Sequence, residues 1–455
     1  MFWRVVFCAV SFLPLIVLIT LVLHCFVEVP FSDQWWLVPQ IDSAAAGRLR
    51  LSDLWHHANE HRLFFPQLIM VPMAVATGWN QWWEVAVNGL FSCCQFGVVA
   101  ATVRHSRVMG GPVTAMLVPA ASLVVFSAAA FENWMWSWQM PFFMVAACVA
   151  LTCHFAVGAA EGGRRGAGSM AMAAVAATVA TYSFGIGLAA WVGGFVTLAG
   201  SFHPIPCGES RESDRFRIRR LAAWAALAGV AAAGYMQGYS PPKWSSPQSS
   251  ILEQPLRTLK FWLAVMGAPV DPTGTSPGAM TLGALGLGVY VTAAVAAWKG
   301  MLGPRRAMAP FVGWGAFAVS GCLLIAVGRA NFMELIYAGA TRYFTYSHFL
   351  WLSIVALLAG LIDVRSAAAP LRRVYRRAGL GIGLLVLVLL ATASVRGRHG
   401  FAWMSERMAR GRSALLDRTF SDDKTLFLIA RDPRMVRDTW GPILVRRKLS
   451  VFREK

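Results

Sequence analysis

The sequence has few charged residues and little that would suit a soluble or disulfide-bonded protein. Only 14% of its 455 residues are charged, whereas 57% are hydrophobic, and this balance excludes a soluble domain of such length. None of its eight cysteines forms a Cys-x-x-Cys pair, and seven of them lie in hydrophobic segments. Neither a disulfide framework nor a cysteine metal site is therefore indicated, and the composition predicts a polytopic membrane protein.

Several motifs of well-known enzyme classes are also missing. The sequence contains no Walker A motif, no Gly-x-Gly-x-x-Gly in a strand-helix unit and no Gly-x-Ser-x-Gly elbow. A nucleotide-driven reaction in the cytoplasm is therefore unsupported. The first apolar stretch, 5–27, is longer than a secretory signal needs and lacks a small-residue cleavage site, so we expect it to be retained as a membrane span.

The chain carries a formal net charge of +19, which could suggest binding to nucleic acid. Most of the Lys and Arg residues, however, lie in short links between apolar segments or near the end of the chain. Basic links of this kind mark the cytoplasmic side of a membrane protein, and their charge meets anionic lipid. We therefore interpret the charge as topological and expect no nucleic-acid partner.

Hydrophobic runs bounded by charge, Gly or Pro predict an all-α fold with about 11 transmembrane helices. The region 169–200 is longer than one span, and Tyr182-Ser183-Phe184-Gly185 divides it into two short helices. The other predicted spans are 5–27, 84–103, 112–130, 140–158, 220–238, 280–298, 308–328, 345–364 and 378–394. With the basic links inside, the first long loop, residues 28–83, lies on the outer face.

Two shorter apolar stretches, 63–77 and 261–270, fit this alternation only if they do not cross the bilayer. We expect both to be half-embedded helices in outer loops. The sequence thus divides into a transmembrane domain, 1–394, and a small C-terminal extramembrane unit, 395–455. The side on which this unit lies is open, because parity places it outside while its positive charge favours the inside.

The first outer loop holds the residues that most suggest a site. Asp33 follows the first span and stands before Trp35 and Trp36. The simplest interpretation of such tryptophans is an interfacial belt, and an outer-loop Asp is usually solvated or caps a helix. A second carboxylate, Glu132, lies at the outer end of a later span, and together the two predict a catalytic pair.

Aromatic and basic side chains near these acids suggest a sugar and a phosphate. Glu132 is followed by Trp134, Trp136, Trp138 and Gln139, and tryptophans either anchor a helix or stack on sugar rings. Arg62 and Arg342, the latter next to Tyr343, stand near outer ends of apolar segments. Arginine binds phosphate oxygens with two donors, although an isolated arginine often only reaches toward lipid headgroups.

The segment His57-Ala58-Asn59-Glu60-His61 matches the His-x-x-Glu-His pattern of zinc peptidases. The match is short and no distant third ligand stands out, so we assign no metal ligands, although a divalent metal is compatible with the chemistry. We expect Glu60 and His61 to bond sugar hydroxyls or to order the loop. Lys243, in the long outer loop with Trp244, Arg257 and Lys260, is a secondary candidate for guiding a lipid phosphate.

These features resemble the GT-C superfamily of integral membrane glycosyltransferases. The resemblance rests on a retained first span, an acidic residue just after it, half-embedded helices in the first outer loop and a second acid at the outer end of a later span. The segments Phe31 to Trp36 and Asn59 to Pro66 look like a bacterial branch of this superfamily. The chain lacks an Asp-x-Asp motif at Asp33, and its C-terminal unit is smaller than the family's outer domains.

The resemblance implies an inverting transfer of a sugar, a hexose or a pentose, from a polyprenyl-phosphate carrier to an envelope glycan, lipid or protein. It implies a site on the outer face of the bacterial cytoplasmic membrane, with Asp33 as base or acceptor-positioning residue, Glu132 as second acid and Arg62 beside the donor phosphate. Two alternatives remain from the residues: a lipid-linked sugar flippase or other transporter, and a scaffold without catalysis.

Overall fold

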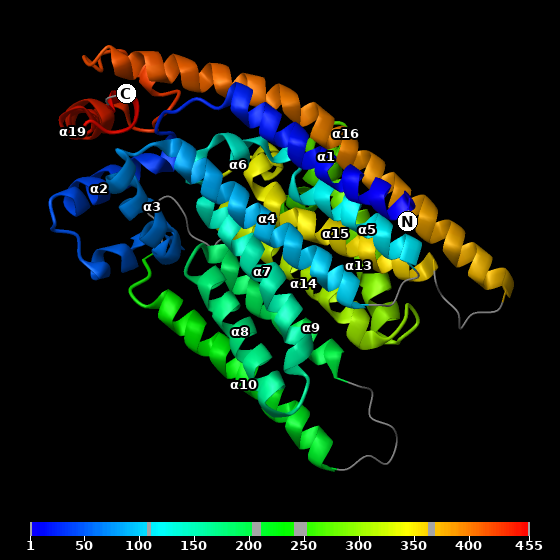
Figure 1. Cartoon of the computed structure of the whole chain (residues 1–455). Helices are drawn as coiled ribbons and strands as arrows, with labels where there is room; N and C mark the ends of the chain where they lie inside the picture. The colour runs from blue at the N-terminus through cyan, green and yellow to red at the C-terminus, as the bar shows by residue number, and fades with distance from the viewer. Residues whose placement is uncertain (1, 107–110, 203–210, 241–252, 363–368, 454–455) are drawn as a thin grey trace.

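The computed structural model describes residues 2–106, 111–202, 211–240, 253–362 and 369–453. Eleven helices of this part overlap the predicted spans, and the prediction of an all-α polytopic membrane fold is confirmed. They are α1 (Phe2–Cys25), α4 (Gln81–Ser106), α5 (Gly111–Val125), α7 (Met140–Ala159), α8 (Gly163–Thr181), α9 (Ala189–Ser201), α10 (Arg211–Met236), α13 (Ser276–Trp298), α14 (Arg305–Arg329), α15 (Phe344–Ile362) and α16 (Ala369–Leu416). They form one elongated bundle (Figure 1).

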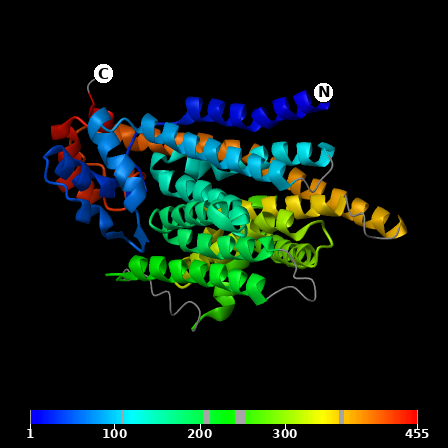
Figure 2. The same cartoon turned by 60° about the horizontal axis from the view of Figure 1, so that its bottom comes forward.

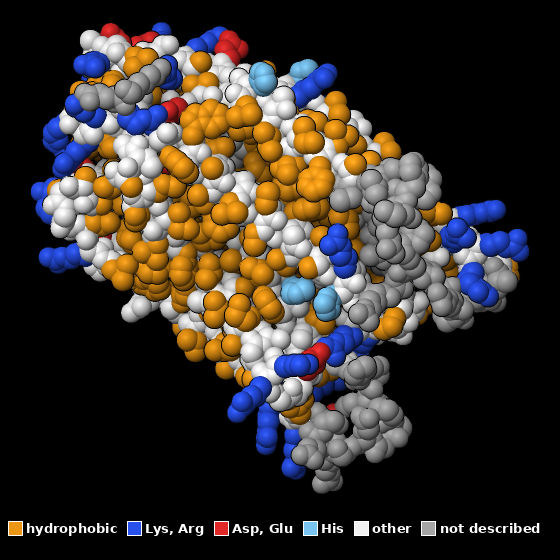
Figure 3. Space-filling model, viewed as in Figure 1, with side chains coloured by type: hydrophobic (Ala, Val, Ile, Leu, Met, Phe, Trp, Pro, Cys, Tyr) orange, Lys and Arg blue, Asp and Glu red, His pale blue; other side chains and the backbone are white. Residues whose placement is uncertain are grey.

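Seven helices of the described part are long and apolar enough to cross a membrane. The others are shorter or more polar, and the division of residues 169–200 appears as α8 and α9, separated by the 3-10 turn η5 (Gly185–Leu188). Hydrophobic side chains cover the middle of one face of the bundle, whereas Lys and Arg gather toward its margins (Figure 3). This distribution is that of a surface that meets lipid tails between two polar boundaries.

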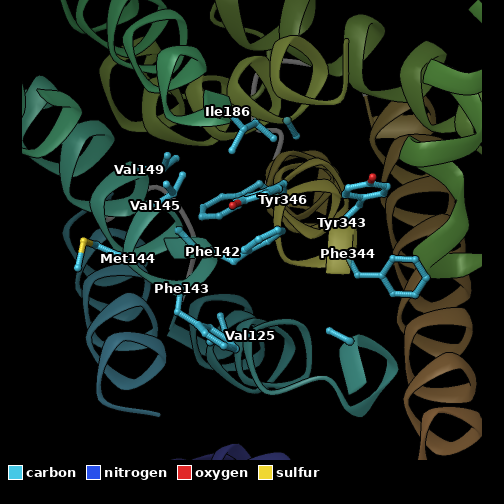
Figure 4. Close-up of a cluster of buried hydrophobic side chains, with 14 of the residues drawn as sticks. Val125, Phe142, Phe143, Met144, Val145, Val149, Ile186, Tyr343, Phe344 and Tyr346 are labelled. Carbon is cyan, nitrogen blue, oxygen red and sulfur yellow. The ribbon is translucent and has the colours of Figure 1, made fainter. Parts of the chain in front are cut away.

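The centre of the bundle is packed by α7, α14 and α15, whose residues are buried on nearly every side. The ring of Phe142 stacks on Tyr346 with centroids 5.2 Å apart and contacts Phe184 at 4.6 Å. Figure 4 shows the rings of Phe142 and Tyr346 beside Ile186 and Val145. Through Phe184, this cluster contacts the turn after α8 at one end of the bundle.

The first long loop, residues 28–83, folds into short elements at that end of the bundle. They are η1 (Ser32–Trp36), α2 (Leu37–Ala45), η2 (Leu51–Trp55), the two-stranded hairpin β1 (His57–Ala58) and β2 (His61–Arg62), and α3 (Phe64–Thr77). Helix α3 ends at Gly78, whose φ of 62° is the left-handed conformation that glycine adopts without strain. A helix of 14 residues is about 20 Å long, too short to cross a bilayer core of roughly 30 Å.

The second short apolar stretch forms α12 (Pro255–Gly267) and the turn η6 (Ala268–Val270). Glycines let α12 approach α13 closely: a Cβ on Gly267 would lie 1.9 Å from the carbonyl oxygen of Ala279. At 13 residues, α12 is also too short to span the bilayer. Whether α3 and α12 lie half-embedded, as the alternation predicts, stays a prediction.

Helix α16 corrects one predicted boundary. The expected span ended at residue 394, but the helix continues without interruption to Leu416 and is 48 residues, or about 72 Å, long. The charges that begin at Arg396 end the apolar run but not the helix, because arginine is a good helix former. The second half of α16 therefore leads from the bundle into the C-terminal unit (Figures 1 and 2).

The rest of the C-terminal unit consists of short turns: α17 (Asp423–Leu426), α18 (Pro433–Met435), the π-helical turn η9 (Val436–Trp440), α19 (Gly441–Arg447) and η10 (Ser450–Phe452). It packs against the first loop. Arg447 donates to Asp42 at 2.6 Å, Arg453 donates to Glu28 at 2.8 Å, and the ring of Trp440 stacks on Trp35. The unit therefore lies at the same end of the bundle as the Asp33 loop, and the side of the membrane on which both lie stays a prediction.

Candidate functional site

A cavity of about 2020 Å³ opens at the end of the bundle that carries the first loop. Its walls come from segments far apart in the sequence: the first loop, the link between α5 and α7, the turn after α8, the end of α10, the α12–α13 region, the link between α14 and α15, and the C-terminal unit. The short links at this end therefore enclose one shared space. Seven predicted site residues line it: Asp33, Glu60, His61, Glu132, Trp138, Arg342 and Tyr343.

Asp33 lies on η1 at the rim of the cavity. The preceding Ser32 has φ of 51°, a strained conformation for a serine, and its N–H donates to the carbonyl of Ile429 at 2.7 Å. The indole of Trp35 donates to the same carbonyl at 3.0 Å. The nearest cation in an ion pair with Asp33 is the exposed Arg431, 3.9 Å away, so the carboxylate is accessible and only weakly paired.

Glu132 lies on α6 (Phe131–Met135) and is bound by Arg342 in two ways. The backbone N–H of Arg342 donates to one carboxylate oxygen at 2.9 Å, and its guanidinium donates to the other at 3.4 Å. Arg342, on η8 (Thr341–Tyr343), also lies over the ring of Tyr343, 5.0 Å from the centroid. The second acid is thus held in an ion pair by Arg342.

Glu60 forms a second, more enclosed group with His61 and Arg329. Its carboxylate accepts from Nε2 of His61 at 3.2 Å and pairs with the guanidinium of Arg329. Burial opposes its ionisation, but the neighbouring His61 and Arg329 outweigh burial and hold the pKa of Glu60 well below its usual range. The hydroxyl of Tyr235 donates to the Glu60 carbonyl at 2.7 Å, which ties α10 to the hairpin.

The neighbourhood of His61 requires a glycine. The imidazole stacks on Phe184 with centroids 3.7 Å apart, and a Cβ on Gly185 would lie 3.0 Å from its Nδ1 and 2.8 Å from the Tyr235 hydroxyl. Gly185 therefore lets η5 approach the hairpin. This packing fixes both faces of the His61 ring.

Arg62 does not contact the cavity, and the prediction that it approaches the donor phosphate is wrong. Its side chain is buried, and its guanidinium donates to the carbonyls of Tyr235, Trp55 and Gln237. It also stacks over Trp55, 4.6 Å from the ring centroid. In the hairpin, side chains alternate in direction, so His61 faces the cavity and Arg62 faces α10.

Two further predictions fail in the link between α5 and α7. Trp134 is buried and donates to the carbonyl of Ser127 at 3.1 Å, and Gln139 is buried outside the cavity. Trp136 and Trp138 do line the cavity, with their rings stacked 5.4 Å apart. The tryptophans alternate in sequence, but they lie on α6, on the 3-10 turn η4 (Ser137–Gln139) and at the residue between them, so they do not all face the same side. Lys243 and Trp244 lie outside the described residues.

The sequence interpretation missed three kinds of contributor. Arg329 follows a predicted span just as Arg342 precedes one, so the same reasoning would have found it. Arg396, Arg407 and Arg431 reach the cavity from the C-terminal unit, which carried no signal of its position. Glu84 was placed at the start of a span, but it lies buried behind Asp33 and accepts three hydrogen bonds.

The zinc-like segment is a hairpin rather than the helix on which such motifs bind metal. His57 Nε2 lies 3.1 Å from the carbonyl oxygen of Tyr235, while His61 is engaged with Glu60 and Phe184. Within the described residues, no group of three or more His, Cys, Asp or Glu side chains is arranged to hold a metal ion. The two imidazoles therefore serve different contacts.

One side of the cavity is apolar. Ala264 from α12, Ala279 from α13 and Leu324 and Ile325 from α14 line it, and the exposed side chain of Ile336 continues it outward. The opposite side holds the acids and arginines described above. The cavity is thus amphipathic, as expected of a site for a molecule with a charged head and an apolar tail.

Two solved structures are similar in fold to this chain. No family model and no curated protein matches the chain. Among solved structures, the fold is similar to ArnT from Cupriavidus metallidurans bound to undecaprenyl phosphate, with 14% identity over 98% of this chain and 89% of that one and a TM-score of 0.44. The apo state of ArnT gives 15% identity, 97% and 88% coverage and a TM-score of 0.45.

Proposed function

We propose that this protein is an inverting membrane glycosyltransferase that moves a sugar from a polyprenyl-phosphate carrier to an envelope acceptor. The observation that carries the proposal is the contrast between carboxylates in one cavity. Asp33 is weakly paired, whereas Glu60 and Glu132 each hold an arginine in an ion pair. A weakly paired carboxylate beside fixed cations is the arrangement needed to activate a nucleophile against a phosphate leaving group.

In this proposal the arginines bind the donor phosphate. Arg329 and Arg342 line the cavity, and each is oriented by a carboxylate. Guanidinium groups match phosphate oxygens in geometry and charge. The apolar side at Ala264, Leu324 and Ile325 accommodates the first isoprene units, and the stacked Trp136 and Trp138 offer a face for the sugar ring.

The proposed reaction is a single displacement at the anomeric carbon of the sugar. The acceptor hydroxyl or amine attacks the anomeric carbon from the side of Asp33 and gives its proton to that carboxylate. The bond between the anomeric carbon and the phosphate oxygen breaks, and its electron pair leaves with the polyprenyl phosphate. Arg329 and Arg342 stabilise the charge that grows on the leaving phosphate, so a single displacement inverts the anomeric centre.

The test compares cells that lack the gene with cells complemented by wild type, Asp33→Asn or Asp53→Asn. Mass spectrometry of lipid extracts and surface glycans should show accumulated polyprenyl-phosphate sugar and an unmodified acceptor in the deletion and in Asp33→Asn. Asp53 lies in the same loop but does not line the cavity, so Asp53→Asn should restore the wild-type pattern. Normal transfer by Asp33→Asn would overturn the proposal, as would donor trapped only on the cytoplasmic leaflet, the result expected of a flippase.

A further inference from the structure

A buried carboxylate behind the cavity joins the segments that form its Asp33 side. Glu84 stands in the first turn of α4 and is 1% exposed. One of its oxygens accepts from Nε2 of Gln34 at 2.8 Å and from the hydroxyl of Ser137 at 2.6 Å. The other accepts from the indole of Trp79 at 3.0 Å. A single side chain thus bonds to η1, to η4 and to the turn between α3 and α4.

The bond to Gln34 reaches the turn that carries Asp33. Gln34 is fully buried, and its amide nitrogen donates to Ser137 at 2.8 Å as well as to Glu84. Its carbonyl oxygen accepts the backbone N–H of Phe31 at 3.3 Å. The amide therefore clamps both ends of the Phe31–Gln34 turn, within which Ser32 has its left-handed φ and Asp33 faces the cavity.

The bond to Ser137 fixes the aromatic wall. Ser137 lies between Trp136 and Trp138, the two stacked rings that line the cavity. One helical turn beyond Glu84, Asn88 donates to the carbonyl of Ser137 at 2.9 Å. The start of α4 therefore holds both the side chain and the backbone of Ser137, and through it the placement of the two indoles.

The contacts match a carboxyl group better than an amide. Three donors converge on the two oxygens of Glu84, whereas an amide offers one acceptor oxygen and would turn an N–H toward one of the donors. No ion pair with Glu84 is present in the part of the chain that the structure describes. Its partners there are the three neutral donors, and it stands at the N-terminal end of α4.

We infer that Glu84 is a positioning residue that fixes Asp33 and the Trp136–Trp138 pair relative to each other on one side of the cavity. The inference rests on the proposed function for its catalytic consequence, but its structural part is independent of that function. Glu84 does not line the cavity. It acts through Gln34 on Asp33, the proposed base, and through Ser137 on the stacked tryptophans proposed to bind the sugar.

Hydrogen exchange of the purified protein in nanodiscs tests the structural part. Glu84→Gln should accelerate exchange several-fold in peptides covering residues 31–36 and 136–139, while α7 and α14 keep their wild-type protection. Glu161→Gln is the matched control, because Glu161 pairs with Arg306 at the opposite end of the bundle, and it should leave both peptides unchanged. Uniformly faster exchange, or no local change, would overturn the inference.

Transfer kinetics test the catalytic part. Glu84→Gln should lower kcat by about 10- to 100-fold with little change in the donor KM, because a misplaced base slows the chemical step. The reciprocal pair Gln34→Glu with Glu84→Gln restores a carboxylate facing an amide and should recover much of kcat. If the pair is no better than the single variant, the positioning role is refuted.

The two experiments separate the two claims. If Glu84→Gln loses protection locally but the wild type transfers no sugar, the proposed function is refuted. The structural role of Glu84 in fixing the Asp33 turn and the two tryptophans is then retained. Transfer by the wild type and by Glu84→Gln at the same rate would refute the positioning role and keep the function.

Discussion

The two walls of the cavity use carboxylates in opposite ways. On one wall, Glu60 pairs with Arg329 and His61, and Glu132 pairs with Arg342, so each acid fixes a cation. On the Asp33 wall, the ion pair that Asp33 forms within the described residues is with the exposed Arg431 at 3.9 Å, and the Asp33 turn is held by neutral hydrogen bonds to Ile429 and by Gln34. The carboxylates of the first wall are fixed in ion pairs with arginines, whereas the Asp33 carboxylate of the second wall is only weakly paired.

This difference in pairing suggests different roles for Asp33 and Glu132, which the sequence alone groups as one catalytic pair. Glu132 is bound by both the backbone N–H and the guanidinium of Arg342, whereas Asp33 pairs with an exposed guanidinium 3.9 Å away. The two acids hold similar positions after apolar segments but have different partners. In the proposed function, Asp33 is therefore the base and Glu132 orients Arg342.

The largest expected effect comes from the free carboxylate. Asp33→Asn should lower kcat by about 10²- to 10⁴-fold, the usual contribution of a general base, and should leave the donor KM nearly unchanged. The measurement is steady-state transfer by the purified protein, with Asp53→Asn as the control for a loop aspartate outside the cavity. A loss confined to KM would move Asp33 from the chemical step to binding and would erase the contrast between the walls.

The next effect concerns the paired wall. The double variant Glu132→Gln with Arg342→Gln removes both charges together, so no buried charge is left unpaired. It should raise the donor KM by about 10- to 100-fold, which corresponds to the loss of one or two hydrogen bonds to a charged group, with a smaller change in kcat.

Arg62→Gln provides the comparison for this prediction. Because Arg62 binds three backbone carbonyls away from the cavity, its loss should lower the midpoint of thermal unfolding without raising the donor KM. If Arg62→Gln raised KM as much as the double variant, the assignment of the phosphate to the Arg342 wall would fail.

The sequence predicted the fold further than it predicted the site. Span positions follow from runs of apolar residues, and the eleven helices lie where those runs lie. The end of α16 was missed because helix formation continues after hydrophobicity stops. Asp33, Glu132 and Arg342 were found because charge beside an apolar run is costly and therefore informative.

The remaining site residues depend on tertiary contacts that no local pattern encodes. Arg62 and His61 are adjacent in sequence, and only the pairing of two short strands decides which of them faces the cavity. Arg407 and Arg431 come from a unit whose docking on the first loop is set by partners about 400 positions away, such as Asp42 and Arg447. The Glu84 hub likewise brings together residues 34, 79 and 137.

A smaller effect should appear in the pH dependence of stability. The pKa of Glu60 is held below its usual 4.5, so its pairing stabilises the fold above about pH 4.5 and is lost as the pH falls below that value. Glu60→Gln should therefore cost about 1–2 kcal/mol of unfolding free energy at pH 7 and at pH 5, since the pair is partly open to the cavity. The difference from wild type should shrink below pH 4.5.

Thermal unfolding in nanodiscs at several pH values measures this difference. Glu406→Gln is the control, because Glu406 and Arg410 form an exposed pair on α16 whose loss should change little at any pH. A gap that widens as the solution becomes more acidic would contradict the assignment of a tight Glu60–Arg329 pair.

The smallest effect concerns the contact that brings the C-terminal unit to the Asp33 wall. A hydrogen bond from Arg447, opposed by burial and aided by Arg446, lowers the pKa of Asp42. Asp42→Asn should cost about 1 kcal/mol or less, because Arg453 and Glu28 form a second pair between the same parts. Hydrogen exchange should quicken in residues 441–447 but not in 427–431, since the Ile429 carbonyl keeps its donors from Ser32 and Trp35. If exchange quickened in both segments, the Asp33 turn would depend on the Asp42 contact. The Asp33 wall would then need the C-terminal unit for its stability, unlike the wall with the two acid–arginine pairs.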